Sequence, residues 1–339
     1  MTKRTRIAIN GFGRIGRTFF RVAHNSQDIE IVAINDLSPL SILFHALKRD
    51  SVYRRFPGSL LYNPDRNEIV CPDQQVKLFS ERDPGKLPWR ELGIDIVVDA
   101  SGIFDTIAKL TPHLNAGAKR VVLTAPAKDD MPTATPNVGE ENLLKGPITS
   151  NSSCTTNCAN PVVTVLSRYR LITELLISTT HAYTASQSLV DGLGNEKDAN
   201  RGRAAALNMI PSTTGAAREI GRFTPELSGG RSDGLSVRVP VPAGSLLDLT
   251  FLSPIEISRE SINQVLMAAA KENEWEGILD VSTEPLVSGD IIGVSYGSTV
   301  DLSLTRTTGH LAKVMAWYDN EWGYCSMLLK HIQTVAKLL

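Results

Sequence analysis

The stretch SNSSCTTNC, residues 150–158, places Cys154 among small hydroxyl and amide side chains, with Cys158 four positions later. We interpret PITSN as a strand and CTTNCANPVVTVLSRY as a helix, so Cys154 would lie at or near the first turn of that helix. Unpaired N–H groups at a helix N-terminus stabilise a thiolate and lower the pKa of the thiol. Cys154 is therefore a candidate nucleophile.

Other roles for the cysteines have less support in the sequence. Cys154 and Cys158 could share one helical face around a metal ion, but the sequence has no companion C-x-x-C or H-x-x-x-H pair. The N-terminus passes straight into a patterned strand without a long apolar stretch, which favours a reducing cytoplasm and disfavours disulfides. We expect no metal site, and we interpret Cys158, Cys71 and Cys325 as packing residues.

His181 is the candidate base. It ends the predicted strand in STTHAYT, and a strand–helix–strand path could bring its imidazole beside Cys154. From the residues alone, a catalytic role and a buried hydrogen-bonded role weigh about equally. The other histidines fall in helical or turn patterns and are predicted to be structural or solvated.

A second motif, INGFGRIGR, places Gly11, Gly13 and Gly16 as G-x-G-x-x-G between a predicted strand and a predicted helix. Such glycines permit a tight turn, close approach to a pyrophosphate and close helix packing. Asp36 closes the next strand, at the spacing of an acid that binds ribose hydroxyls, and it favours NAD over NADP because it repels a 2′-phosphate. The alternative is a glycine-rich turn with a solvated aspartate.

The surrounding patterns predict the elements that hold these motifs. RIAIN and IEIVAIN, with a helical segment between them, have the form of a βαβ unit, and IDIVVDAS and RVVLTAP are further buried strands. After about residue 150, long strand-like runs such as LLISTTHAYT and SLLDLTFL alternate with a few helices. We therefore predict an α/β domain followed by an α+β domain, with a C-terminal helix that packs on the first.

The composition and net charge restrict the kinds of partner that the protein is expected to bind. The chain has 339 residues, of which 42% are hydrophobic, and a formal net charge of −1, so it can bury a sizeable core, divided between two domains. Near-neutral charge gives no broad attraction for nucleic acid or anionic lipid. We expect no dedicated nucleic acid or membrane partner.

The segments INGFGRIGR, AINDL, SNSSCTTNC, HAYTASQSLVDG, IPSTTGAAREIG, VRVPVP and WYDNEWGY occur in an order and spacing that resemble the phosphorylating glyceraldehyde-3-phosphate dehydrogenase family over essentially the whole chain. The resemblance implies a Rossmann NAD-binding domain over residues 1–153, joined by a C-terminal helix of about 320–339. It implies an α+β catalytic domain over 154–319 with a mixed eight-stranded sheet. It further implies a cytoplasmic homotetramer, in which residues 183–206 lie at the cofactor site and the subunit interface.

The resemblance also implies roles for residues. Cys154 would be the nucleophile and His181 its base and thiolate partner. Thr184 and Arg238 would bind the phosphate of the substrate. Asn320 would hold the nicotinamide carboxamide. The implied NAD-binding residues are Gly11, Gly13, Arg14, Ile15, Gly16, Asp36, Asn320 and Tyr324. The residues implied for an attacking inorganic phosphate are Ser153, Thr155, Arg201, Thr214 and Gly215.

The implied activity is oxidation of glyceraldehyde 3-phosphate with NAD and inorganic phosphate to 1,3-bisphosphoglycerate through a cysteine thioester, a step of glycolysis and gluconeogenesis. One alternative is erythrose-4-phosphate dehydrogenase, which releases its product to water; AYTASQ, STTGAA and WYDNEWGY favour the phosphorylating enzyme. Another is a non-catalytic nucleotide- or RNA-binding protein, which the joint presence of Cys154, His181 and Asn320 disfavours. Leu193 stands where NAD-specific relatives commonly have proline.

Overall fold

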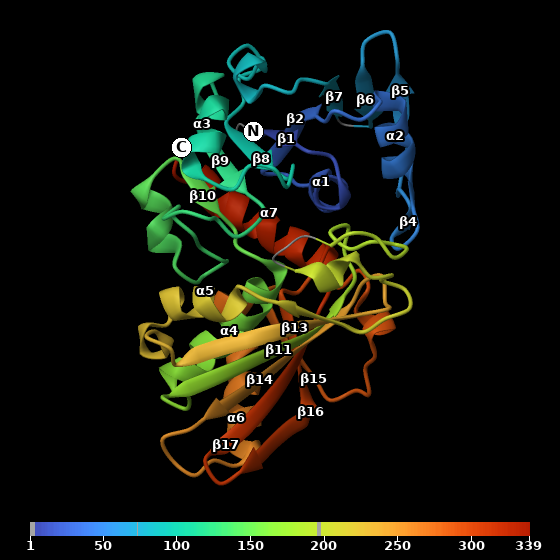
Figure 1. Ribbon diagram of the computed structural model, residues 1–339. Coiled ribbons are helices and arrows are strands. Elements are labelled where there is room, and N and C mark those ends of the chain that lie inside the picture. Colours follow the sequence, from blue (N-terminus) through green and yellow to red (C-terminus); the bar gives the residue numbers. More distant parts are fainter. Residues whose placement is uncertain (1–3, 73, 195–197) are drawn as a thin grey trace. The chain divides into compact units, whose positions relative to one another are not determined.

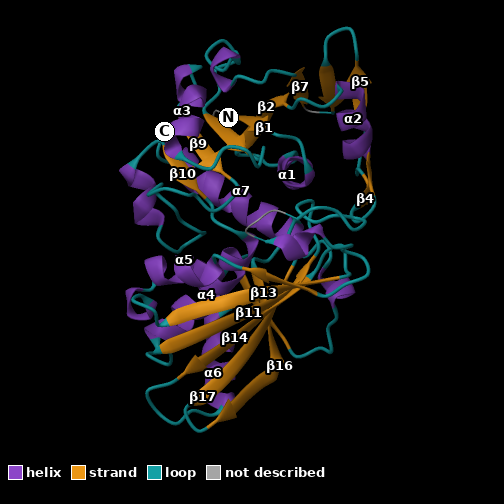
Figure 2. Ribbon diagram, viewed as in Figure 1, coloured by secondary structure: helices purple, strands orange, loops and turns teal. Residues whose placement is uncertain are grey.

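The computed structural model describes residues 4–72, 74–194 and 198–339 (Figure 1). The chain divides into two compact units: Met1–Ala134 with Gly139–Ser152 and Leu328–Leu339, and Thr135–Val138 with Ser153–Met327. Relative to the boundaries expected from the sequence, Thr135–Val138 belongs to the second unit, and the C-terminal boundary falls inside a helix at Met327. Figure 2 shows that the strands of each unit gather into a sheet.

The first unit is built on a sheet in the order β10-β9-β8-β1-β2-β7-β6-β5. The pairs from β10 through to β7 are parallel, whereas β7, β6 and β5 pair antiparallel. Its strands are β1 (Thr5–Asn10), β2 (Ile29–Asn35), β5 (Leu61–Asn63), β6 (Glu68–Cys71), β7 (Gln74–Phe79), β8 (Ile96–Asp99), β9 (Arg120–Leu123) and β10 (Ile148–Ser150). The predicted α/β domain is thereby confirmed.

The central strands are apolar because both faces of the sheet are covered. All four residues of β8 are buried, as are Ile7, Ala8 and Ile9 of β1. The helices and 3-10 turns of this unit are α1 (Arg14–Ala23), α2 (Leu40–Lys48), η1 (Pro84–Lys86), α3 (Ile107–Asn115) and η2 (Glu140–Lys145), and a two-stranded hairpin joins β3 (Arg49–Asp50) to β4 (Arg54–Arg55). The parallel strands end together, near the turn that carries Gly11.

The last helix, α7 (Trp322–Ala336), begins in the second unit and ends in the first. Its C-terminal half packs there through buried His331, whose Nε2 lies 3.4 Å from Thr149 Oγ1. Gln333 Nε2 donates to Asp28 Oδ2 at 2.8 Å. No helix formed by the described residues is both long enough and apolar enough to cross a membrane.

The second unit has a mixed sheet in the order β12-β13-β11-β14-β17-β16-β15, in which only β11–β13 and β15–β16 are parallel pairs. Its strands are β11 (Glu174–Ala182), β12 (Ile210–Thr213), β13 (Ser232–Val239), β14 (Ser245–Leu252), β15 (Leu279–Ser282), β16 (Ser298–Thr308) and β17 (Leu311–Tyr318). Its helices and 3-10 turns are α4 (Cys154–Arg168), η3 (Ala199–Gly202), α5 (Ala216–Phe223), η4 (Pro225–Leu227), α6 (Arg259–Ala269), η5 (Asn273–Trp275) and η6 (Ser288–Ile291).

The mixed type of this sheet agrees with the sequence expectation, but its described strands number seven, where we expect eight. The described residues between β11 and β12, 183–194 and 198–209, contain the 3-10 turn η3 and contribute no strand to the sheet. Glycine, aspartate and asparagine are frequent in this segment and favour turns. One face of the sheet packs on α4 through apolar residues of one core, among them Val162, Val163, Leu247 and Leu249.

Candidate active site

Cys154 is the first residue of α4. Ser153 caps this helix, because its Oγ accepts the N–H of Thr156 at 3.1 Å. The Cys154 side chain is partly exposed, whereas Cys158 is fully buried one turn later, where its Sγ contacts Ser298 Oγ at 3.6 Å. Burial raises the pKa of the Cys158 thiol to about 12. Cys154 is the member of this pair that a substrate can reach, because its side chain is partly exposed.

His181 lies beside Cys154. The last residues of β11 bring His181 Nε2 to 3.4 Å from Cys154 Sγ. On the other side of the ring, His181 Nδ1 lies 2.6 Å from the carbonyl oxygen of Ala182. β11 pairs in parallel with β13, in a register that sets Arg238 opposite His181, and Arg238 Nη1 donates to the same carbonyl at 3.3 Å.

The ionisation of this pair differs from the sequence expectation. Burial raises the pKa of the Cys154 thiol, although Arg238, the Thr155 hydroxyl and the N–H groups of residues 154 and 155 act to lower it. Burial, followed by the charge of Arg238, lowers the pKa of His181 to about 3. The expectation of a lowered thiol pKa is wrong, because removal of the thiolate from water outweighs the effect of the helix N-terminus.

These pKa shifts determine the protonation states of Cys154 and His181. At neutral pH the pair consists of a thiol and a neutral imidazole. His181 Nδ1 lies 2.6 Å from the Ala182 carbonyl oxygen and 3.0 Å from Arg238 Nη1. We assign the imidazole proton to Nδ1, because the shorter contact, with an acceptor, needs a donor on the ring, so that Nε2 offers its lone pair to the thiol. His181 is therefore oriented to accept the proton of Cys154.

Arg238 retains an unused donor at this site. Its Nε is buried and has no hydrogen-bond partner among the described residues. A buried N–H of a guanidinium group without an acceptor is costly, and an anionic ligand would supply that acceptor. Thr184, the other residue implied for the substrate phosphate, is linked to Arg201 by Ser186. Thr184 Oγ1 lies 2.9 Å from Ser186 Oγ, which accepts a hydrogen bond from Arg201 Nη1.

Arg201 is held by its neighbours. Its Nε pairs with Asp198 Oδ2 at 2.7 Å and donates to Ser212 Oγ at 2.9 Å, while Nη1 donates to Ser186 Oγ at 3.0 Å. The charge of Arg201 also contributes to the lowered pKa values of His181 and Arg238. The structure thus gathers two arginines near the Cys154–His181 pair, one on η3 and one on β13.

The remaining residues of the implied phosphate pocket have different surroundings. Thr155 is buried, and its Oγ1 lies 3.1 Å from Tyr318 Oη. Thr214 Oγ1 accepts the N–H of Ala216 at 3.3 Å, at the start of α5. A Cβ added to Gly215, the N-cap of α5, would meet nothing within 4 Å, so its backbone is open to a ligand.

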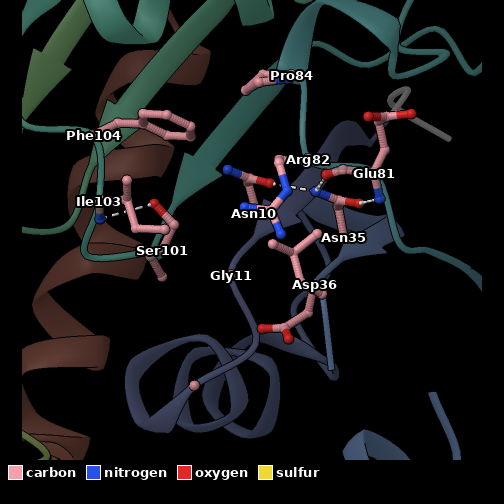
Figure 3. A pocket seen from close by; sticks show the side chains of 13 residues that line it. Asn10, Gly11, Asn35, Asp36, Glu81, Arg82, Pro84, Ser101, Ile103 and Phe104 are labelled. Carbon is pink, nitrogen blue, oxygen red and sulfur yellow. Dashed lines mark hydrogen bonds between the residues drawn. The ribbon is translucent and has the colours of Figure 1, made fainter. Parts of the chain in front are cut away.

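The first unit contains a separate pocket of about 350 Å³ at the carboxyl ends of its parallel strands (Figure 3). Its lining residues are Asn10, Gly11, Gly13, Asn35, Asp36, Leu37, Glu81, Arg82, Pro84, Ala100, Ser101, Ile103 and Phe104. Three of the residues implied for NAD, Gly11, Gly13 and Asp36, are among them. The Asp36 carboxylate is anchored, because Oδ2 accepts the N–H of Phe12 at 2.7 Å and Oδ1 that of Ser38 at 2.8 Å.

The glycines of the G-x-G-x-x-G motif have distinct roles. Gly11 has φ +90°, and an added Cβ would lie 2.4 Å from the Cα of Ser101. A Cβ on Gly16 would lie 2.2 Å from the carbonyl oxygen of Gly11, so Gly16 allows α1 to pack closely. Gly13 faces open space. This cradle fits a dinucleotide pyrophosphate at the start of α1.

The other residues implied for NAD lie outside the pocket lining. Arg14 and Ile15 are on α1, where Arg14 forms an ion pair with Asp50. Asn320 and Tyr324 are buried residues of the second unit. Asn320 Oδ1 accepts the hydroxyl of Ser245 at 2.9 Å, and Ser245 Oγ accepts the N–H of Ala182.

Several residues that contact the site were missed by sequence reasoning. Ser186 joins Thr184 to Arg201, Ser245 orients Asn320, and Tyr318 packs edge-on against His181 at 5.9 Å between ring centroids. Tyr318 stands in the WYDNEWGY segment, so its nearness to Asn320 was an available signal. Ser186 likewise stands in the HAYTASQSLVDG segment, two residues after Thr184, whereas Ser245 carries no such signal, because isolated serines are common in loops and strands.

Comparison with known proteins identifies the family. The model of the NAD binding domain of glyceraldehyde 3-phosphate dehydrogenase matches residues 5–107, and the model of its C-terminal domain matches residues 153–320. The chain is 44% identical to glyceraldehyde-3-phosphate dehydrogenase of Mycolicibacterium smegmatis, over 98% of this chain and 99% of that protein. It is 44% identical to glyceraldehyde-3-phosphate dehydrogenase 2 of Streptomyces arenae, over 96% of each chain, and 43% identical to the Mycobacterium avium enzyme, over 98% and 99%. The chain belongs to the glyceraldehyde-3-phosphate dehydrogenase family.

Proposed function

We propose that this protein is a phosphorylating, NAD-dependent glyceraldehyde-3-phosphate dehydrogenase of glycolysis. It would convert glyceraldehyde 3-phosphate and inorganic phosphate to 1,3-bisphosphoglycerate by way of a thioester on Cys154. The observation that carries this proposal is the 3.4 Å contact between Cys154 Sγ and His181 Nε2, beside a guanidinium group with an unused buried donor. The names of the relatives, identical at 43–44% of positions over nearly the whole chain, support the same activity.

In the first step, His181 Nε2 accepts the thiol proton of Cys154 while Sγ adds to the aldehyde carbonyl carbon. The carbonyl π electrons move to oxygen and produce an oxyanion. The N–H of Cys154 and the newly formed imidazolium of His181 stabilise that charge, and one such donor contributes on the order of 10²–10³ in rate. Thr184 and Arg238 hold the substrate's phosphate through charge-assisted hydrogen bonds.

In the second step, the imidazolium protonates the oxyanion and then removes the same proton as the carbonyl forms again. NAD⁺ held by the first unit would accept the hydride that leaves carbon as the carbonyl forms again. The open backbone at Gly13 and the anchored carboxylate of Asp36 fit the pyrophosphate and adenosine ribose of this cofactor. The same carboxylate disfavours a 2′-phosphate, so we propose a preference for NAD over NADP.

In the third step, an oxygen of inorganic phosphate attacks the thioester carbon, the C–S bond breaks, and Cys154 leaves as a thiolate. We assign the attacking phosphate to Ser153, Thr155, Arg201, Thr214 and Gly215. Arg201 is suited to this role because Asp198, Ser186 and Ser212 hold its guanidinium in place before the anion arrives. The thiolate takes up a proton and the pair is restored.

We further propose that the protein is a cytoplasmic homotetramer. Five large apolar side chains between residues 189 and 209 are more than 70% exposed in the single chain: Leu189, Val190, Leu193, Leu207 and Met209. An exposed apolar group of this size favours contact with a second copy. All four cysteines are free thiols, which supports a reducing compartment.

A pre-steady-state experiment tests the proposed reaction. Enzyme mixed with NAD and glyceraldehyde 3-phosphate, without phosphate, should release a burst of NADH of about one equivalent per active site and then nearly stop. Phosphate or arsenate should restore steady turnover. Steady turnover without either anion, with erythrose 4-phosphate as the better substrate, would instead support a hydrolytic dehydrogenase.

A further inference from the structure

One buried acidic residue near the site has no role in the reaction described above. Glu219 lies on α5 and is 5% exposed. A carboxyl group is rarely buried to this extent unless it is hydrogen-bonded. Its Oε2 accepts the hydroxyl of Thr156 at 2.9 Å, and Thr156 is a fully buried residue in the first turn of α4. Glu219 therefore joins two helices.

The donor and the acceptor can be assigned for each hydrogen bond between Glu219, Thr156 and Ser153. Thr156 has one hydroxyl proton, which it donates to Glu219, so its Oγ1 must accept at its other close contact. That contact is Ser153 Oγ, at 2.7 Å. The Ser153 hydroxyl consequently donates to Thr156, while the same Ser153 oxygen accepts the N–H of Thr156. Glu219 thus fixes the rotamer and the proton of the residue directly before Cys154.

The two joined helices carry both halves of the pocket assigned to the attacking phosphate. Ser153 and Thr155 belong to the start of α4, and Thr214 and Gly215 directly precede α5. Glu219 lies one turn beyond Gly215, since its N–H donates to the Gly215 carbonyl at 3.1 Å. A single carboxyl group therefore connects the first turn of one helix with the first turn of the other.

We propose that Glu219 is a positioning residue for the attacking phosphate. It acts through Thr156 and Ser153, and it sets the spacing between the start of α4 and residues 214–215. The inference rests on the proposed phosphorylating function. A defect in this link should raise the KM for phosphate and leave formation of the thioester intact, because the hydrogen bond of Glu219 to Thr156 acts on Ser153, a residue assigned to the attacking phosphate.

Three variants test the link. Glu219→Ala and Thr156→Val each remove one end of it, and Glu219→Gln keeps an oxygen that can accept the Thr156 hydroxyl. We expect Glu219→Ala and Thr156→Val each to raise the KM for phosphate about tenfold, the double variant to be no worse than either single one, and Glu219→Gln to stay within about threefold. The KM for the aldehyde and the rate of the NADH burst without phosphate should stay within about twofold.

The control is Glu226→Ala, which removes an exposed carboxylate of the following turn η4 and should change neither KM. An unchanged KM for phosphate in Glu219→Ala, or an equal loss in both KM values and in the burst, would overturn the inference. If Glu219→Ala does not fold, Thr156→Val and Glu219→Gln decide the question by the same readouts. A wild-type enzyme that turns over without phosphate would refute the proposed function itself, which is a distinguishable result.

Discussion

At Cys154, opposing effects act on one thiol. Its position at the start of α4 and the nearby charge of Arg238 favour the thiolate, whereas burial favours the neutral thiol and is the larger effect. The same burial keeps His181 neutral. The proton shared by Cys154 and His181 therefore resides on the sulfur of Cys154 until an aldehyde binds. The sequence predicted the two residues and their nearness, but the balance of burial against charge required the packed structure.

The ionisation of this pair predicts how Cys154 reacts with iodoacetamide. Only the thiolate is alkylated, and the thiol pKa is raised, so the rate should rise about tenfold per pH unit from about pH 6 to 8. Peptide mapping would confirm that Cys154 carries the label. A rate that is constant across this range would indicate a preformed thiolate and contradict the assignment.

Steady-state kinetics should distinguish the roles of Arg201 and Arg238. Arg201→Ala is expected to raise the KM for phosphate more than that for the aldehyde, since one charge-assisted contact contributes about 1.5–3 kcal/mol. Arg238→Ala should do the opposite, and it should also raise the pKa of His181, because the Arg238 charge lowers it now. Arg201→Lys and Arg238→Lys serve as charge-preserving controls. Equal effects of the two alanine variants on both KM values would refute the division into two anion sites.

At the scale of elements, fully buried strands were the easiest to predict. β1, β2 and β8 each contain a short buried apolar run, residues 7–9, 31–34 and 96–98, because both faces of the sheet are covered there. β16 carries no such signal, because it buries Ser298, Thr299 and Asp301. The role of Glu219 was likewise not predicted, since its partner Thr156 comes from a distant part of the chain and only tertiary packing brings the two together.

The turn between β1 and α1 yields a prediction about glycine. Gly11→Ala should lower the free energy of unfolding by more than about 2 kcal/mol, because φ +90° and a Cβ 2.4 Å from the Ser101 backbone both oppose a side chain. It should also weaken NAD binding measured by calorimetry. Gly13→Ala is the matched control, with a loss within about 1 kcal/mol, because its Cβ would meet nothing within 4 Å. Equal losses in the two variants would argue against this account of the turn.

At the scale of the whole molecule, each unit contributes a different part of the chemistry. The first holds the dinucleotide cradle, and the second holds Cys154, His181 and both arginines. Residues 189–209 of the second unit expose apolar side chains that the single chain leaves uncovered. The family resemblance predicts a subunit interface that includes residues 183–206, whereas composition and net charge alone make no such prediction.

That surface predicts the mass of the protein in solution. Sedimentation equilibrium should give four copies of the 36.9 kDa chain. Met209→Asp should shift the population to smaller assemblies, because it places a charge within the apolar group. Leu144→Asp, at a residue that is 70% exposed on η2 in the first unit, is the control and should leave the mass unchanged. A single-chain mass for the wild type would contradict the homotetramer.

The central claim is that the reaction passes through a thioester on Cys154, and mass spectrometry of the trapped enzyme tests it most directly. Enzyme mixed with NAD and glyceraldehyde 3-phosphate in phosphate-free buffer, then quenched in acid, should carry one 3-phosphoglyceroyl group on the peptide containing Cys154. Addition of phosphate before the quench should remove it, and Cys154→Ser should never acquire it although it still binds NAD. An adduct on another residue, or full turnover with no adduct at any time, would contradict the account.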